Sequence, residues 1–222
     1  MTTEIQYQGR KTRRTGSEQR RQAILEASLN IIVRDGIRAV RHRSVAREAG
    51  VPLSATTYYF KDLSDLIADT FALFAERAIK EVVEPFKEQA FGLMSQFSRD
   101  SLKNPQERGR LVQLLAQMMG AFIVDELQNR RDHIVAEQAF IQEAVLDPRL
   151  REMADMYLAQ HVETLAMACE LFGCKHPKLD GELIFSTFLT IEQRLLVHPE
   201  KVSQAFAEKR MHNLMEKVIP HG

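Results

Sequence analysis

The stretch IRAVRHRSVAREAGVPLSATTYYFK, residues 37–61, contains the pattern that decides the fold of this chain. Between His42 and Ala49, apolar residues recur at the spacing of one buried helical face. Gly50 follows, and glycine readily adopts the left-handed backbone conformation that ends a helix. Pro52 then suits the first turn of a second helix, because its φ is already helical and it has no N–H to lose. The stretch therefore predicts two short helices joined by a tight turn.

The second of these helices, residues 53–60, is rich in hydroxyl and aromatic side chains. A helix, a turn containing glycine and a second helix make the helix-turn-helix unit, whose second helix enters the major groove of DNA. Hydroxyl groups suit phosphates and base edges, whereas small apolar groups can contact thymine methyls. Thr56 and Phe60, four residues apart, should face the protein core, and packing is also the favoured role of Tyr59. The residues expected to face DNA are Arg41, Arg43, Leu53, Ser54, Ala55, Thr57, Tyr58 and Lys61.

The run AREAGVPLSATTYYFKDLSDL, residues 46–66, resembles the DNA-binding signature of the TetR family of bacterial transcriptional regulators. The resemblance covers about residues 17–75. It implies an all-α fold, with an N-terminal three-helix helix-turn-helix DNA-binding domain and a C-terminal helical ligand-binding and dimerisation domain. The chain departs from the family pattern at two positions. Leu63 stands where the family usually has a phosphate-contacting lysine, and Arg41 stands where it usually has serine or threonine.

The distribution of charge also favours a nucleic-acid-binding face near the N-terminus. Residues 1–61 contain 12 Lys and Arg against 5 Asp and Glu, although the whole chain has a formal net charge of zero. A basic segment joined to an acidic remainder is typical of a DNA-binding domain attached to a domain with another task. We expect a flexible basic arm over residues 1–16, a DNA-binding domain over 17–62 and a ligand-binding and dimerisation domain over 63–222. In the arm, Arg13 and Arg14 could lie along phosphates or enter the minor groove; a solvated tail is the alternative, given equal weight.

The rest of the chain shows helical periodicity interrupted by helix-breaking residues, and no strand pattern. Asp62 is a good N-cap for the helix that follows the helix-turn-helix, and Pro85 should break or restart that helix. Asp147 should cap a later helix, and Gly173 should end it. The helices predicted after Pro85 cover residues 86–102, 106–127, 132–145, 148–172, 178–197 and 200–218.

The sequence lacks the motifs of common enzymes and metal sites, including GxSxG, a phosphate-binding glycine loop, HExxH and Cys-x-x-Cys. We therefore expect a protein that is not an enzyme and that needs no cofactor and no metal. Cys169 and Cys174 are too few for a disulfide framework. At a spacing of five they should fall on different sides of a helix, which favours two reduced, partly buried thiols over a redox switch.

The N-terminus predicts no export signal. It is polar and basic, without the apolar centre of a signal peptide, and no run approaches the roughly 18 apolar residues of a membrane span. We therefore expect a cytoplasmic, nucleoid-associated protein.

Soft apolar residues in the middle of the chain are candidates for a ligand pocket, because flexible methionine can line an adaptable cavity, although it more often fills ordinary cores. The resemblance raises this expectation, since members of the TetR family commonly bind small molecules among these helices. The helices expected at 148–173 and 178–197 have more apolar surface than one core normally takes, which predicts a symmetric dimer contact. The pocket candidates are Phe91, Met94, Met118, Phe122, Met153, Tyr157 and His161. The dimer candidates are Leu165, Phe172, Ile184, Phe188, Ile191 and Leu195.

Two functions fit this sequence. One is a transcriptional regulator, most commonly a repressor in this family, that binds a palindromic operator as a homodimer and is released by a small apolar ligand. The other is a DNA-binding structural or cell-division factor on the same fold that acts through a protein partner. An apolar pocket in the second domain would favour the first function, and a solid core with a partner-sized surface patch would favour the second.

Overall fold

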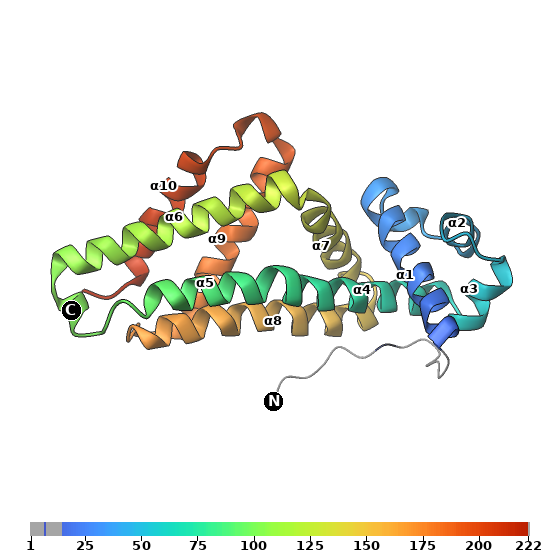
Figure 1. Ribbon diagram of the computed structural model, residues 1–222, viewed down its shortest axis with the longest axis horizontal. Helices are drawn as coiled ribbons and strands as arrows, with labels where there is room; N and C mark the ends of the chain where they lie inside the picture. Colours follow the sequence, from blue (N-terminus) through green and yellow to red (C-terminus); the bar gives the residue numbers. More distant parts are fainter. Residues whose placement is uncertain (1–6, 8–14, 222) are drawn as a thin grey trace. The chain divides into compact units, whose positions relative to one another are not determined.

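The computed structural model describes Tyr7 and residues 15–221; the rest of the predicted basic arm, including Arg13 and Arg14, lies outside the described residues. Within the described part every regular element is a helix, as the sequence predicted (Figure 1). Packing divides the chain into two compact units. The first contains the residues up to 79 together with 135–157, and the second contains 80–134 together with 158–222.

The N-terminal part of the first unit consists of one long helix followed by short ones (Figure 1). The first helix starts at Thr15, and Gly36 follows its last residue with a φ of 84°. The two short helices match the predicted helix-turn-helix to within one residue at each end. These elements are α1 (Thr15–Asp35), η1 (Ile37–Ala39), α2 (His42–Glu48) and α3 (Leu53–Tyr59).

An ion pair is buried in the core of the first unit. Arg21 of α1 donates from Nη2 to Asp69 Oδ2 of α4 (Leu63–Ala78) over 2.6 Å, and Asp69 is fully buried. An unpaired charge at this depth would be costly, so each of the two residues requires the other. Apolar side chains of α1 to α4 fill the rest of the core, among them Ile24, Ile31, Val45, Phe60 and Leu66.

An aromatic cluster joins α4 to α7 (Arg131–Ala144) and α8 (Pro148–Leu171) inside the first unit. Phe71 of α4 stacks on Phe140 of α7 with ring centroids 4.8 Å apart, and Tyr157 of α8 meets Phe71 edge to face at 5.9 Å. Tyr157 also donates its hydroxyl to Glu137 Oε1 over 2.8 Å. Because of this cluster, the first unit extends beyond residue 62, where the sequence analysis placed a functional boundary.

The second unit contains the start of α7, the end of α8 and the remaining helices, one of which is shorter than predicted. The helix expected over residues 86–102 ends at Met94. Its continuation is lost because Ser98 and Ser101 bond to each other's backbone N–H groups at 3.0 and 3.1 Å, which offers the chain an alternative to helix. The elements are η2 (Ile79–Val83), α5 (Glu84–Met94), η3 (Ser101–Lys103), α6 (Pro105–Asn129), α9 (Pro177–Val197), η4 (Pro199–Lys201) and α10 (Gln204–Val218).

Helices α6 and α10 pack closely against each other in the second unit (Figure 1). A Cβ added to Gly120 of α6 would lie 2.9 Å from the backbone nitrogen of Glu208, so only glycine permits this approach. Arg108, near the start of α6, is buried and donates to the backbone oxygens of Glu216 and Ile219 over 2.6 and 2.9 Å. These bonds satisfy carbonyl groups at the end of α10 that have no partner within the helix.

Candidate nucleic-acid interface

The turn between α2 and α3 has the geometry that the sequence predicted. Gly50 has a φ of 64°, its N–H donates to Arg47 O over 3.3 Å, and the N–H of Val51 donates to Ala46 O over 3.0 Å. This pair of bonds is the Schellman motif, which ends a helix with glycine in the left-handed conformation. Pro52 follows directly and precedes the first residue of α3. The turn therefore fixes where the second short helix begins.

The inner face of α3 holds this helix against the first unit's core. Thr56 and Phe60 are fully buried, as predicted, and Tyr59 is buried as well. The hydroxyl of Tyr59 hydrogen-bonds to Ser17 Oγ of α1 over 2.9 Å. Ser17 therefore supports α3 from within α1.

The outer face of α3 presents the predicted DNA-facing side chains to solvent. Leu53 is 43% exposed and Tyr58 is 55% exposed, although both are large and apolar or aromatic. Tyr58 packs edge to face on Tyr59, with ring centroids 5.1 Å apart, so the buried Tyr59 fixes the orientation of the exposed Tyr58 ring. Ala55 is half-buried. The other exposed candidates are Arg41, Arg43, Ser54, Thr57 and Lys61.

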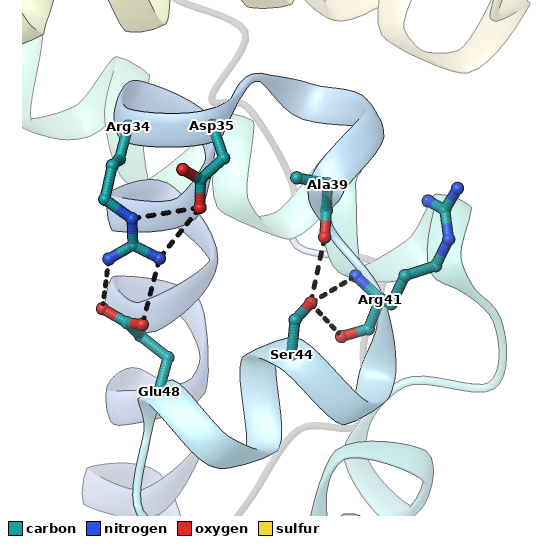
Figure 2. A network of polar contacts seen from close by, with 6 residues as sticks. All are labelled: Arg34, Asp35, Ala39, Arg41, Ser44 and Glu48. Carbon is teal, nitrogen blue, oxygen red and sulfur yellow. Dashed lines mark hydrogen bonds and ion pairs between the residues drawn. The ribbon is translucent and has the colours of Figure 1, made fainter.

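A polar network holds α2 against the end of α1 (Figure 2). The guanidinium of Arg34 donates two hydrogen bonds to the carboxylate of Glu48, from Nη1 over 3.1 Å and from Nη2 over 3.2 Å. Its Nε atom also donates to Asp35 Oδ2 over 3.0 Å. Ser44 Oγ accepts from the N–H of Arg41 over 3.0 Å and thereby caps the first turn of α2. A guanidinium has no acceptor atom, so Arg41 itself does not cap the helix, and its side chain is exposed.

The start of α4 is tied to the start of α8 by two hydrogen bonds that the sequence analysis missed. Asp62 caps α4 as predicted, accepting from the N–H of Asp65 over 2.8 Å. Ser64 Oγ then donates to Asp147 Oδ2 over 2.7 Å, and Arg149 Nη1 donates to Asp65 Oδ1 over 3.0 Å. Burial acts to raise the pKa of Asp147, but the hydrogen bonds from Ser64 and from the backbone of Arg149 outweigh it and hold that pKa below its ordinary value. No local pattern in the sequence could have paired residues more than 80 positions apart.

The predicted pocket residues are distributed over both units. Met153 and Tyr157 are buried in the first unit, and Met94 belongs to the apolar core of the second. His161 stacks on Phe185 with ring centroids 5.1 Å apart. Phe91 is half-buried in α5. The seven candidates therefore do not form one site within either unit.

Two of the candidates, Met118 and Phe122, line a cavity of about 250 Å³ in the second unit. Phe86 of α5 adds a second ring, 4.5 Å from that of Phe122. Polar groups line the same cavity, including Glu81, Gln89, Asp125 and Arg130. The cavity thus combines an aromatic wall with acidic side chains and with Arg130, which is paired with Asp125.

The predicted dimer residues require correction. Phe172, Ile184, Phe188, Ile191 and Leu195 are buried in the second unit's own core, and Leu165 is partly buried against that core. The periodicity predicted an apolar face that would contact a second copy of the chain. In the structure, α9 packs this face against the core of its own unit. The large apolar side chains that α8 and α9 leave exposed are instead Met167, Leu171, Leu179, Leu183 and Val197.

The described part of the chain contains neither a metal-binding cluster nor a membrane-spanning helix. Its His, Cys, Asp and Glu side chains form no group of three or more that could hold a metal ion. None of the described helices has the length and apolar character that crossing a membrane requires.

The fold has counterparts among known structures. No protein-family model matches the sequence, and no curated protein shows significant sequence similarity to it. A transcriptional regulator from Rhodococcus sp. Rha1 superposes with a TM-score of 0.62 at 17% identity, covering 89% of this chain and 95% of the other. A TetR-family member from Streptomyces coelicolor A3 gives 0.59 at 21% identity, covering 90% and 98%. The multidrug-binding protein EbrR, in complex with proflavin, gives 0.56 at 24% identity, covering 88% and 99%. The chain therefore has the fold of TetR-family transcriptional regulators.

Proposed function

We propose that this chain is a sequence-specific DNA-binding transcriptional regulator. In this proposal, it acts as a repressor that a small molecule releases from its operator. The observation that carries the proposal is the outer face of α3, where hydroxyl, aromatic and cationic side chains project from a helix whose inner face is fully packed. A helix that is buried on one side and polar on the other is the form in which proteins read the major groove.

The role of each exposed residue follows from its chemistry. Arg41, Arg43 and Lys61 are cations at the start of α2 and just after α3, where they suit phosphate oxygens. Ser54, Thr57 and Tyr58 can exchange hydrogen bonds with phosphates or base edges, and Leu53 can contact a thymine methyl. Phosphate contacts give affinity for any DNA, whereas the groups on α3 would give the preference for one sequence.

Useful specificity also requires two reading helices, because one helix-turn-helix contacts only a few base pairs. A symmetric homodimer places them about 34–36 Å apart, one turn of the duplex, and implies a near-palindromic operator. We propose that the exposed apolar residues Met167, Leu171, Leu179 and Leu183 form the dimer contact. They belong to α8 and α9, the two helices for which the sequence predicted this role, but they are exposed, whereas most of the predicted residues are buried.

The cavity beside Phe86 and Phe122 is the proposed site of the small molecule. Its volume of about 250 Å³ is slightly below the usual range of ligand pockets, which begins at about 300 Å³, so it suits a compact ligand. The two aromatic rings favour an apolar group, and the carboxylate of Glu81 favours a positive charge on it, whereas the carboxylate of Asp125 is already paired with Arg130. The EbrR structure with proflavin supports a binding role for a unit of this fold.

Communication between ligand and DNA would pass through helix α4, whose first turn follows α3. Ser64 and Asp65 at the start of α4 bond to Asp147 and Arg149 at the start of α8, so a shift of α8 would move the turn that follows the reading helix. A ligand can shift DNA affinity only by its differential affinity for the two states, typically about 1–3 kcal/mol.

The proposal is tested by selecting DNA fragments from a genomic library with the purified chain and then measuring affinity for the enriched sequence. Tyr58→Ala should abolish the preference for that sequence over random DNA while the circular dichroism spectrum stays unchanged. Lys61→Ala should weaken binding to both DNAs and reduce the log–log salt slope by about 0.9. Lys209→Ala, which removes an exposed cation of α10 in the second unit, is the charge-matched control and should change neither. Failure to enrich any sequence, or equal losses in all three variants, would contradict the proposal.

A further inference from the structure

The end of α8 brings the two cysteines of the chain together. Gly173 has a φ of 77°, its N–H donates to Glu170 O over 3.0 Å, and the N–H of Cys174 donates to Cys169 O over 3.1 Å. This is again the Schellman motif, in which the residues at the two ends of the longer hydrogen bond commonly make a side-chain contact. Those residues are here Cys169 and Cys174. On an uninterrupted helix a spacing of five would separate them, as the sequence analysis expected, but the helix ends between them.

The two cysteines are buried in the apolar core of the second unit. Cys169 is 3% exposed and Cys174 is 7% exposed, and the backbone bond between the two residues holds their side chains on the same side of the turn. Cys174 Sγ also donates weakly to Val218 O over 3.4 Å. The adjacent residues Gly173 and Lys175 are exposed, so opening of a single helix end would admit a small reagent.

The surroundings of the pair make the two sulfurs unequal. The neighbouring Cys174 thiol raises the pKa of Cys169, and burial raises it further. The neighbouring Cys169 thiol lowers the pKa of Cys174 and outweighs the effect of burial, and the nearby Arg99 guanidinium acts in the same direction, against the Asp180 carboxylate. Arg99 is held in place by its bond from Nε to Leu171 O over 2.9 Å. The Arg99 guanidinium carbon lies 3.6 Å from the position of a Cβ on Gly173, the residue next to Cys174, so a thiolate is favoured on Cys174. Cys174 is therefore the nucleophile of the pair, because the thiolate is the reactive form.

We propose that Cys169 and Cys174 are an oxidisable dithiol that closes to an intramolecular disulfide when a peroxide is the oxidant. The Cys174 thiolate attacks one peroxide oxygen, the O–O bond breaks, and hydroxide leaves, so that Cys174 becomes a sulfenic acid. Cys169 Sγ then attacks the Cys174 sulfur, the S–S bond forms, the S–O bond breaks, and water leaves with the proton of Cys169. The two electrons lost by the pair reduce one peroxide to water and hydroxide. This site is independent of the proposed DNA binding.

In the test, the reduced full-length chain is exposed to hydrogen peroxide, and the remaining thiols are alkylated with iodoacetamide under denaturing conditions. The mass of the intact protein is then measured by mass spectrometry. The expected product is a single chain that carries no alkyl group on either cysteine and that regains two alkylation sites after reduction. A chain that keeps both thiols, while a free dithiol peptide in a parallel tube is oxidised, would overturn the proposal. A disulfide between two chains would also overturn it.

Two serine variants test the assigned roles, and each keeps a hydroxyl that can replace the thiol as hydrogen-bond donor. In Cys169→Ser, peroxide should leave a sulfenic acid on Cys174 that dimedone traps. In Cys174→Ser, trapping on Cys169 should be about tenfold lower, because that thiol is less often ionised. Equal trapping at the two positions would refute the assignment of Cys174 as nucleophile.

Discussion

Phe188 and Leu183 lie on the same helix, α9. Substitution of Phe188 should destabilise the fold, whereas substitution of Leu183 should disrupt the dimer. Phe188 is 6% exposed, and its ring meets those of Phe86 and Phe122 edge to face, each at 5.9 Å. Removing a buried phenylalanine to alanine costs about 3–5 kcal/mol. Against a total stability of about 5–15 kcal/mol, this loss is large. Leu183 is 55% exposed, so truncating it removes less than half of a leucine's usual buried surface and should cost at most about 1–2 kcal/mol in the isolated chain.

The assay combines urea denaturation with sedimentation. Phe188→Ala should lower the free energy of unfolding by about 3–5 kcal/mol at every protein concentration. Leu183→Glu should leave a folded monomer, because an unpaired charge cannot be desolvated at an apolar contact. Denaturation of the parent chain should depend on concentration if it is a dimer, and that dependence should vanish in Leu183→Glu.

Two results would refute this reasoning. If Phe188→Ala kept its stability and sedimented as a monomer, Phe188 would be an interface residue and the burial argument would be wrong. If Leu183→Glu remained a dimer, the exposed face of α9 would not be the contact.

Three further predictions concern other parts of the chain. Deleting residues 1–14 should weaken binding to all DNA about equally and reduce the log–log salt slope by about 0.9 for each phosphate that the arm neutralises in the intact chain; an unchanged slope would identify the arm as a solvated tail. Arg108→Met should cost about 2–4 kcal/mol and raise amide exchange at the end of α10, because the oxygens of Glu216 and Ile219 lose their donor, and unchanged exchange would contradict this. Asp147→Ala should cost about 1 kcal/mol at pH 7, as for other helix caps that are removed. Because the folded-state pKa of Asp147 is lowered, its contribution to the free energy of unfolding is present above the ordinary carboxyl pKa and disappears as the pH falls through the lowered value. A stability difference between the variant and the parent chain that persists in acid would exclude the carboxylate as the source of that difference.

Features that depend on a few neighbouring residues could be predicted from the sequence. Gly50 and Pro52 determine where α2 ends and α3 begins through their own backbone preferences, and the structure places both ends within one residue of the prediction. The inward direction of Thr56 and Phe60 likewise follows from helical spacing.

Features that depend on distant neighbours could not be predicted. The apolar face containing Phe188 was recognised, but its spacing does not reveal whether the same chain or a second copy covers it. The bond between Ser64 and Asp147 joins residues 83 positions apart, so no local pattern announces it. The proximity of the cysteines was missed for a different reason. Gly173 ends the helix between Cys169 and Cys174, so the spacing that separates residues five apart on a continuous helix does not apply to them.

The two faces of α3 have separate tasks, and this has a consequence for how such a protein can change over time. Thr56, Tyr59 and Phe60 hold the helix in the core, whereas Ser54 and Thr57 are exposed. Exposed positions of this kind tolerate most substitutions at a cost within about 0.5 kcal/mol. The outer residues can therefore be exchanged one by one without unfolding the chain. A duplicated copy could acquire a new target sequence through a series of stable intermediates, and an engineer could follow the same route by randomising only the outer positions.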